Sequence, residues 1–269
     1  MVSVERSSSV AHEHVLKNEW HADLAEDKKR PESSYSELVS FVVPIYNEEE
    51  NIKGVIDEWY RVAEKVGNGS RLVIIDDGSK DATFKIMKDA AKSREAFLPL
   101  TKKNGGHGAA VLYGYHYAIE EGADYIFQTD SDGQTLPEEF EEFWKNREHF
   151  DMVIGYRKGR HDGCLRVFVT KVLRAVIWLC FCVYVRDANT PYRLIRGQTL
   201  RRYIDLIPPG FHLANVLISV IFVKKGCKVK WLPITFRPRQ GGKNSMNGKK
   251  IVKIGCSAVR DFWKINRLL

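Results

Sequence analysis

Two carboxylates one residue apart, Asp130 and Asp132, directly follow an apolar run at residues 125–129. The run predicts a buried strand, so both side chains are expected where that strand emerges into a loop. Carboxylates at this spacing can share one hard divalent cation, and Mg²⁺ or Mn²⁺ bound in this way keeps open positions for substrate phosphates. The pair therefore predicts a metal site that receives a phosphorylated ligand.

A second acidic pair, Asp76 and Asp77, closes another apolar run at residues 72–75. One acidic strand end is common in loops. Two such strand ends in the same half of a chain suggest that a nucleotide binds beside the metal.

Other loop chemistries fit these residues poorly. A calcium EF-hand loop that starts at Asp130 needs glycine at its sixth position, which is Thr135. A phosphatase nucleophile loop would have threonine where Gln134 stands. The glycine cluster at residues 105–108 lacks the Lys-Ser/Thr of a P-loop and has Val111 where the third Rossmann glycine belongs.

Strand-like and helix-like patterns alternate through the first half of the chain. Asn47 and Glu50 form a capping-box pattern ahead of a helix. Such alternation predicts a doubly wound α/β fold, in which a mostly parallel sheet is flanked by helices and ligands bind beyond the carboxyl ends of the strands. Tyr46, Asp76 and Asp130 would then lie along one edge. The expected strands are 39–43, 72–75, 97–100, 125–129 and 152–154, and the expected helices are 52–66, about 81–91, about 108–120 and one that begins near residue 137.

The charge of the chain is unevenly distributed. Its formal net charge is +8, but residues 151–269 carry 24 Lys and Arg against 5 Asp, a net +19, whereas residues 1–150 carry 18 basic against 29 acidic residues, a net −11. A half this basic favours anionic partners such as phosphates or an acidic membrane surface; the alternative is a merely solvated basic surface. No nucleic-acid partner is expected, because Trp178, Phe181 and Trp231 lie in apolar runs and not among exposed basic residues.

Targeting signals are missing from the sequence. The first thirty residues have no apolar signal-peptide core, and the longest apolar run, 175–185, is shorter than the ~20 residues of a membrane-spanning helix. The five cysteines match no zinc spacing and fit a reducing compartment. We therefore expect a cytoplasmic protein without a signal peptide or transmembrane helix, with peripheral attachment to the inner face of the cell membrane as a further expectation.

Two segments have an amphipathic pattern. Residues 164–184 place an apolar stripe opposite Arg166 and Arg174, which predicts either a helix packed on the sheet or an interfacial helix. Residues 249–269 predict a basic amphipathic C-terminal helix. Residues 1–36 have no periodicity and are expected to be a flexible extension.

Taken together, the motifs resemble the family 2 glycosyltransferases of the GT-A fold, particularly the dolichol-phosphate mannose synthase-like branch. The resemblance runs from about Val39 to about Asn247. The matching motifs are P-x-Y-N-E at 44–48, D-D-G-S at 76–79, the Gly/Ala pattern from 105, D-x-D at 130–132, D-x-x-S-G-F-R at 187–193 and P-I-x-F-x-x-R at 233–239.

The resemblance implies roles for individual residues. Asp130, Asp132 and Gln134 would coordinate a Mg²⁺ or Mn²⁺ cofactor on the donor diphosphate, and the catalytic residues would be Asp132, Asp187 and Arg239. The implied donor contacts are Pro44, Tyr46, Glu48, Asp76, Asp77, Gly108, Asp130, Arg157 and Arg166, and the implied acceptor contacts are Thr190, Tyr192 and Arg193.

The acceptor side departs from the family pattern, since Thr190 and Pro191 replace Ser-Gly and residues 211–215 contain no carboxylate. A polyprenyl phosphate carries an oxygen that is already ionised at neutral pH and needs no strong base. A sugar hydroxyl needs a base, and Asp187 is then the leading candidate. The alternative role for Asp187 is a loop acid paired with Arg186 or Arg193.

The sequence thus predicts one GT-A domain over residues 37–248, with a nucleotide-sugar half (37–158) and an acceptor-side half (159–248). We expect it to move a hexose from a UDP- or GDP-sugar to a polyprenyl phosphate or lipid-linked glycan. The alternative is a soluble transferase that adds a sugar to a saccharide hydroxyl in cell-surface polysaccharide synthesis. An anionic membrane surface or a membrane partner protein is a further candidate partner.

Overall fold

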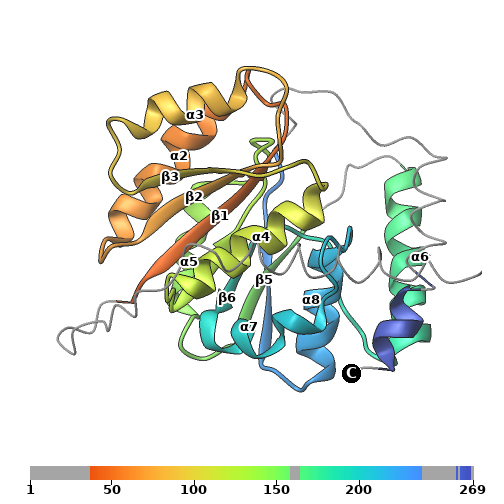
Figure 1. Cartoon of the computed structure of the whole chain (residues 1–269). Helices are drawn as coiled ribbons and strands as arrows, with labels where there is room; N and C mark the ends of the chain where they lie inside the picture. Colours follow the sequence, from red (N-terminus) through yellow and green to blue (C-terminus); the bar gives the residue numbers. More distant parts are fainter. Residues whose placement is uncertain (1–36, 158–163, 238–258, 260, 268–269) are drawn as a thin grey trace, which may run out of the picture. The chain divides into compact units, whose positions relative to one another are not determined.

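Seven strands form one sheet whose central members lead into the acidic motifs (Figure 1). The computed structural model describes residues 37–157, 164–237, 259 and 261–267, and for residues 164–169 it describes the backbone alone. The strand order is β3-β2-β1-β4-β6-β5-β7. The strands are β1 (Val39–Ile45), β2 (Arg71–Asp76), β3 (Phe97–Thr101), β4 (Tyr125–Gln128), β5 (Met152–Arg157), β6 (Arg193–Arg196) and β7 (Val229–Ile234).

The sheet is mostly parallel. Only β6 runs against its neighbours, pairing antiparallel with β4 and with β5. All seven residues of β1 are buried, as expected for a strand that is covered on both faces. The predicted α/β class, a mostly parallel sheet flanked by helices, is therefore confirmed.

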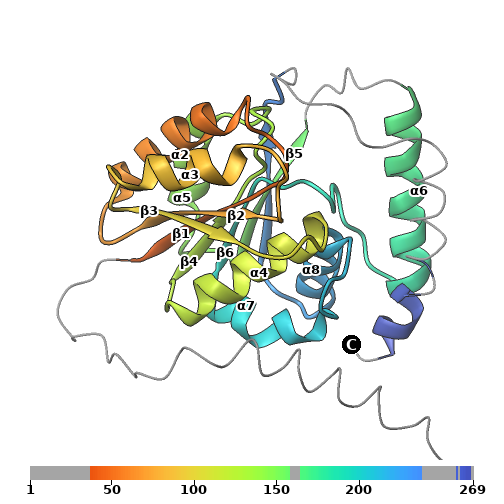
Figure 2. The same cartoon turned by 45° about the horizontal axis from the view of Figure 1, so that its top comes forward.

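Helices cover both faces of the sheet (Figures 1 and 2). Because successive side chains of a strand point to opposite faces, Phe41 and Val43 pack in the core with α2, α3 and α5, whereas Val42 packs in the core with α4, α7 and α8. The helices are α2 (Ile52–Val66), α3 (Thr83–Ala91), α4 (His107–Glu120), η1 (Pro137–Glu139), α5 (Phe140–Lys145), α6 (Cys164–Phe181), α7 (Gly197–Tyr203), η2 (Ile204–Leu206) and α8 (Ala214–Lys224).

A cluster of aromatic rings joins the two halves of the chain. The ring centroids of Phe41 and Phe140 lie 5.0 Å apart, those of Trp59 and Phe127 lie 5.3 Å apart, and those of Phe127 and Tyr192 lie 4.7 Å apart. Tilted and edge-on pairs at such distances stabilise a core beyond the area that they bury. Tyr192 directly precedes β6, so this cluster fixes the start of β6 against the strands of the first half.

The predicted strands and helices of the first half are all present, but the capping box is wrong. Helix α2 begins at Ile52, and its N-cap residue Asn51 makes no side-chain capping bond. Asn47 instead has a left-handed φ of 51°, and its Oδ1 accepts a hydrogen bond from Lys80 N at 2.8 Å. The side chain that was expected to cap a helix therefore joins two loops at the end of the sheet.

Helix α6 is buried on one side only. Ile177, Cys180 and Phe181 belong to the core that also contains α8, and the ring of Phe181 lies 5.3 Å from that of Phe262. Trp178 and Leu179 are more than 60% exposed. Within the described ranges, no helix combines the length and the apolar character that crossing a membrane requires. Of the C-terminal helix predicted at 249–269, residues 261–266 are helical, whereas most of the remainder and the extension at 1–36 lie outside the described residues.

Candidate active site

The carboxyl ends of β1, β2 and β4 lie together at one edge of the sheet. In the parallel registers, Ile45 pairs with Asp76 and Val42 pairs with Gln128. Asp77 N donates to Ile45 O at 2.9 Å, which continues the pairing beyond the strands. The predicted convergence of the three motifs at one edge is therefore confirmed.

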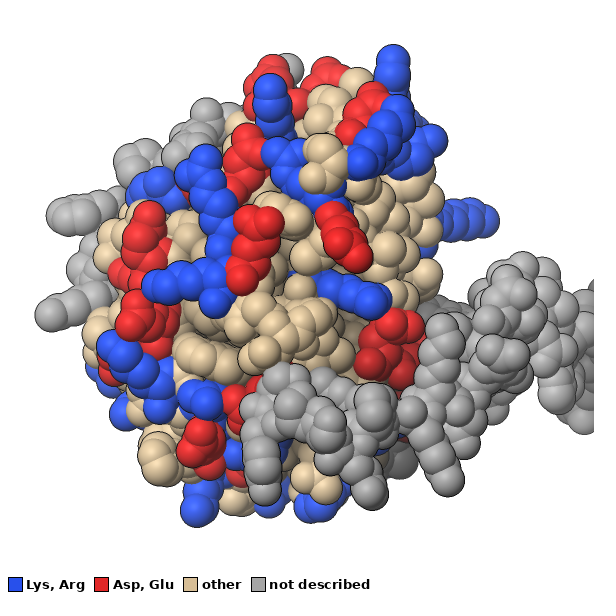
Figure 3. Space-filling view, turned by 90° about the vertical axis from the view of Figure 1, so that its left-hand side faces the viewer, with Lys and Arg blue, Asp and Glu red and all other residues tan. Residues whose placement is uncertain are grey.

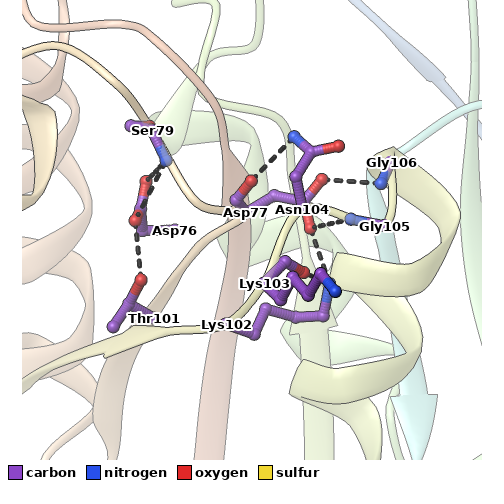
Figure 4. Close-up of polar contacts among 9 residues, drawn as sticks. All are labelled: Asp76, Asp77, Ser79, Thr101, Lys102, Lys103, Asn104, Gly105 and Gly106. Carbon is purple, nitrogen blue, oxygen red and sulfur yellow. Dashed lines mark hydrogen bonds and ion pairs between the residues drawn. The ribbon is translucent and has the colours of Figure 1, made fainter.

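Asp77 organises the glycine-rich loop that leads into α4 (Figure 4). Its Oδ1 accepts hydrogen bonds from Lys102 Nζ at 2.6 Å and from Gly105 N at 2.9 Å, and its Oδ2 accepts one from Gly106 N at 2.7 Å. Asn104 Nδ2 donates to Asp77 O at 2.8 Å. The carboxylate is buried, so these contacts shape the loop that a nucleotide would meet.

The carboxylate of Asp76 also accepts hydrogen bonds from other residues of the protein (Figure 4). Ser79 N donates to its Oδ1 and Oδ2 at 3.1 and 3.3 Å, and Thr101 Oγ1 donates to Oδ2 at 2.8 Å. Gly78 lies between these contacts with a φ of +70°, and a Cβ there would lie 2.9 Å from Asn104 N. A side chain at position 78 would therefore push the two loops apart, which explains glycine in the D-D-G-S motif.

The loop after β1 is bonded to the loop after β2. Asn47 N donates to Ser79 Oγ at 2.9 Å, and Glu48 N donates to Thr83 Oγ1 at 3.0 Å. Pro44 lies within buried β1, whereas the side chain of Tyr46 is 43% exposed. Of these opening residues, Tyr46 is the one whose ring is accessible to a ligand.

Gly108 lies where α4 contacts the loop before α8. A Cβ at this position would lie 2.1 Å from Phe211 O and 2.8 Å from His212 O. Gly108, which is expected to bind the donor, is therefore also needed for α4 to pack against the loop before α8.

We predict that Gly108→Ala displaces the loop at residues 211–212, because the added methyl group overlaps main-chain atoms that cannot rotate away. We expect the free energy of unfolding to fall by roughly 1–3 kcal/mol and nucleotide binding to weaken, as measured by thermal unfolding and by calorimetric titration with UDP. Gly54→Ala is the control, because a Cβ there meets nothing within 4 Å. Equal stability of the two variants would contradict this packing.

The loop after β4 contains the predicted metal ligands. Gln134 N donates to Asp132 Oδ1 at 3.2 Å, which orients that carboxylate. The amide of Gln134 is engaged as well, since its Nε2 donates to Arg237 O at 3.0 Å. A buried hydrogen bond between the hydroxyl groups of Thr129 and Thr135, which lie 2.8 Å apart, joins the two ends of this loop.

These residues fit a divalent cation. Asp130 Oδ1 is buried, and among the described residues it has no hydrogen-bond partner. An oxygen of this kind is costly to bury unless a cation or a donor satisfies it. Asp132 lies two residues further along the same loop, and a pair of carboxylates with substrate phosphates is a common ligand set for Mg²⁺.

The structure brings a further residue, which no sequence motif marks, close to this loop. His107, the first residue of α4, has its Nε2 3.8 Å from Asp130 Oδ1. Its side chain is half exposed and lies beside the loop that contains Asp130. His212 also lies nearby, with its Nδ1 3.5 Å from the position of a Cβ on Gly106. Neither histidine has a sequence spacing that marks it, because their neighbours come from other segments.

Arg157, at the end of β5, lies beside Asp187 in the loop before β6. Arg157 Nε lies 3.7 Å from Asp187 Oδ2, and the guanidinium lies 4.6 Å from the ring centroid of Phe236. The Asp187 side chain is only 6% exposed. Arg186, one of its two expected alternative partners, lies over the ring of Tyr156 at 3.7 Å. Arg157 is therefore placed to hold the charge of Asp187.

The predicted acceptor contacts have their side chains inside the protein. Tyr192 is fully buried, its hydroxyl donates to Leu136 O at 2.8 Å, and burial raises its pKa well above the usual value. Arg193 is also fully buried and donates to the carbonyl oxygens of Thr190, Ala188 and Asn215. Burial lowers the pKa of Arg193, while Tyr115, Asp187 and Asp130 act in the opposite direction. In this arrangement both side chains hold the loop at 187–192 in place.

Two predicted phosphate-facing arginines fall outside what the structure describes. The side chain of Arg166 belongs to the backbone-only part of α6, and Arg239 lies beyond Arg237, the last described residue of that segment. Their predicted roles stay predictions.

Exposed charges of both signs are interspersed on the face shown in Figure 3, which is the left-hand side of Figure 1. Neighbouring exposed charges of opposite sign partly cancel, and salt screens what remains. The described side chains of this face therefore form no extended patch of a single sign.

Comparisons with known proteins agree with this arrangement. Residues 40–198 match the sequence profile described as "Glycosyl transferase family 2". An undecaprenyl-phosphate 4-deoxy-4-formamido-L-arabinose transferase from Shewanella sediminis is 27% identical over 172 residues, which are 63% of this chain and 51% of that protein. A protein of the same name from Salmonella paratyphi B is 31% identical over 142 residues, or 52% of this chain and 42% of that protein. The chain thus spans about half the length of these curated relatives.

Among solved structures, glucosyl-3-phosphoglycerate synthase from Mycobacterium tuberculosis has a TM-score of 0.62 at 16% identity, covering 88% of this chain and 86% of that one. Its complex with Mn²⁺ and UDP-glucose has a TM-score of 0.60 at 17% identity, with coverages of 88% and 84%. At this identity the likeness shows the fold, which is GT-A-like. The profile match covers more than half of the sequence, from β1 into α7, and includes the motifs at 44–48, 76–79, 130–132 and 187–193. The chain belongs to glycosyl transferase family 2.

Proposed function

We propose that this glycosyltransferase moves a hexose from a UDP- or GDP-sugar to a polyprenyl phosphate or a lipid-linked glycan. The observation that carries the acceptor class is the position of Asp187, which is almost fully buried and lies 3.7 Å from Arg157. A general base must come within hydrogen-bond reach of the proton that it takes, and a carboxylate buried to this degree offers little access to a sugar hydroxyl. The acceptor is then one that brings its own ionised oxygen.

On the donor side, we assign the nucleotide to the edge formed by the loops after β1 and β2. Tyr46 offers an exposed ring for the base, and the loop shaped by Asp76 and Asp77 offers main-chain groups for the ribose. Pro44, Glu48 and Gly108 line or support this edge. The structure of the Mn²⁺ and UDP-glucose complex with the same fold supports this class of donor.

Asp130, Asp132 and Gln134 are our proposed ligands for Mg²⁺ or Mn²⁺ on the donor diphosphate. A cation bound there would neutralise charge on the leaving diphosphate. Gln134 would have to ligate through Oε1, since its Nε2 is bonded to Arg237 O. His107 borders the same space and is an additional candidate for contact with the phosphates.

We propose that Arg157 faces the leaving diphosphate as a fixed positive charge, and that Arg166 and Arg239 add to it. Negative charge builds on the departing diphosphate in the transition state, so a cationic group that is already positioned stabilises that state without reorganisation. Phe236 keeps Arg157 in place by stacking on its guanidinium. The proposed acceptor loop is held in place by three buried residues, Thr190, Tyr192 and Arg193.

Two further observations support a lipid-linked acceptor. The curated relatives are named for undecaprenyl phosphate, although this chain spans only about half their length. Trp178 and Leu179 of α6 are exposed, on a helix whose described residues include Lys171 and Arg174. Exposed aromatic and apolar side chains beside basic ones suit the surface of an anionic membrane, and we place the protein peripherally at the inner face of the cell membrane.

We also propose that residues 37–158 and 159–248 act as donor and acceptor halves of one domain. Strands from both halves share one sheet, with β6 between β4 and β5, which supports a single domain built from the two halves.

The acceptor class can be tested with the full chain, Mn²⁺ and a panel of radiolabelled UDP- and GDP-hexoses. The two acceptor arms are a long-chain polyprenyl phosphate in anionic vesicles and a mixture of soluble oligosaccharides. We expect label to enter the lipid fraction and the protein to float with the vesicles at low salt. Label that enters only the oligosaccharides would favour the rival function, a soluble transferase acting on a saccharide hydroxyl.

A further inference from the structure

Hydrogen bonds join the loop after β4 to the end of β7, although about a hundred residues separate them. Arg237 N donates to Gln134 O at 2.8 Å, and Gln134 Nε2 donates back to Arg237 O at 3.0 Å. Arg237 Nη2 donates to Thr135 O at 3.0 Å. Thr235 N donates to the Glu139 carboxylate at 2.9 and 3.1 Å. We call these contacts among Gln134, Thr135, Glu139, Thr235 and Arg237 the loop clasp.

A carboxylate on α2 holds the guanidinium of the clasp. Arg237 Nη2 lies 3.3 Å from Glu58 Oε2, so the same nitrogen contacts Glu58 on α2 and Thr135 O in the loop. Both side chains are about one-third exposed. Arginine presents its N–H donors in a rigid plane, whereas lysine carries one ammonium group on a flexible chain, so we expect lysine to reproduce these two contacts only in part.

The clasp ends at the proposed cation site. Gln134, which makes two of its bonds, also donates its main-chain N–H to Asp132 Oδ1 at 3.2 Å. Gly133 between them has a left-handed φ of 68° and adds no side chain that could stiffen the turn. The direction of the Asp132 carboxylate therefore depends on where the clasp holds residues 134 and 135.

We propose that Arg237 is a positioning residue for the cation loop. It acts through Gln134 and Thr135 on Asp132, and Glu58 fixes Arg237 in turn. The main task of the Gln134 amide is then to close the clasp. This inference rests on the proposed cation site, but it assigns a role to residues that lie outside the D-x-D motif.

The test is the affinity of the full chain for Mn²⁺, measured with and without UDP. Electron paramagnetic resonance reports the concentration of free Mn²⁺ during the titration. Groups that orient metal ligands typically contribute about 10–100-fold to metal affinity. We expect Arg237→Gln and Glu58→Gln each to weaken Mn²⁺ binding by about 10-fold, and Arg237→Lys to restore only part of the loss.

The chain provides a matched control on the same helix. Asp57, the neighbour of Glu58, forms an ion pair with Arg94 at 2.6 Å, and neither side chain belongs to the clasp. The two ion pairs are similarly exposed: Asp57 and Arg94 are 35% and 26% exposed, and Glu58 and Arg237 are 37% and 31% exposed. Arg94→Gln and Asp57→Asn should therefore lower the melting temperature at least as much as the clasp variants, yet leave Mn²⁺ affinity unchanged. Equal losses of affinity in both sets would show a general effect on stability and overturn the proposal.

Gln134→Glu separates positioning from direct ligation. It keeps an oxygen that could bind a cation and even adds charge, but it removes the donor to Arg237 O. Weaker Mn²⁺ binding by this variant is expected if the amide closes the clasp, whereas unchanged or tighter binding contradicts that role. A wild-type chain that fails to bind Mn²⁺ contradicts the cation site itself; a wild type that binds while Arg237→Gln binds equally well contradicts only the positioning role.

Discussion

Asp132→Asn should lower kcat for sugar transfer by about 10³-fold, equivalent to ~4 kcal/mol of transition-state stabilisation. The substitution keeps the size of the side chain and removes the negative charge that the proposed cation requires. It also keeps an oxygen that can accept the hydrogen bond from Gln134 N. We therefore expect the melting temperature to change by no more than about 2 °C, and the loss to appear in kcat and in Mn²⁺ affinity together.

Asp89→Asn is a suitable control, because Asp89 is an exposed carboxylate on α3 that pairs with Lys92. It should transfer sugar at the wild-type rate. Metal-dependent turnover that persists in Asp132→Asn at more than about a tenth of the wild-type rate would remove the assignment of this loop as the cation site.

Arg157→Gln is expected to have the second largest effect, a fall in kcat of about 100-fold. Its guanidinium is held between Asp187 and Phe236, and glutamine can keep part of the packing but none of the charge. The variant also leaves the buried Asp187 carboxylate without this neighbouring cation, so the melting temperature should fall as well. Steady-state kinetics and thermal unfolding measure the two effects separately.

The double variant Arg157→Gln/Asp187→Asn separates catalysis from stability. Removing both charges should recover much of the lost melting temperature, because neither side is then an isolated buried ion. Activity should stay low, since the positive charge near the diphosphate is still missing. Asp187→Asn alone should change kcat by less than about tenfold. A loss of 10²–10⁴-fold in that variant, the usual contribution of a general base, would favour a hydroxyl acceptor.

The first half of the domain could be predicted because local signals there agree with the tertiary structure. Each of β1, β2 and β4 is a short apolar run that ends in polar residues, and parallel strands bring such ends to one edge. Asp76, Asp77 and Asp130 could therefore be placed from the sequence alone. Their detailed contacts could not, because the partners of Asp77, such as Lys102 and Gly106, come from another loop.

The second half of the domain was harder to predict for physical reasons. β6 is only four residues long and runs antiparallel between two strands of the first half, which no periodicity in residues 193–196 indicates. Arg193 shows the same difficulty: a charged residue in a motif suggests a ligand contact, yet its guanidinium is satisfied by main-chain carbonyls in the core. The capping box at Asn47 failed because a tertiary contact with Lys80 replaced the local one.

The central claim is that the loop after β4 binds the cation together with the donor diphosphate. Crystals of the full chain soaked with Mn²⁺ and UDP test it most directly, through the anomalous scattering of manganese. The account predicts one manganese peak within ligand distance of Asp130 or Asp132 and of the diphosphate oxygens, with the uracil near Tyr46. A manganese peak and nucleotide density elsewhere on the protein, with both carboxylates uncoordinated, would contradict it.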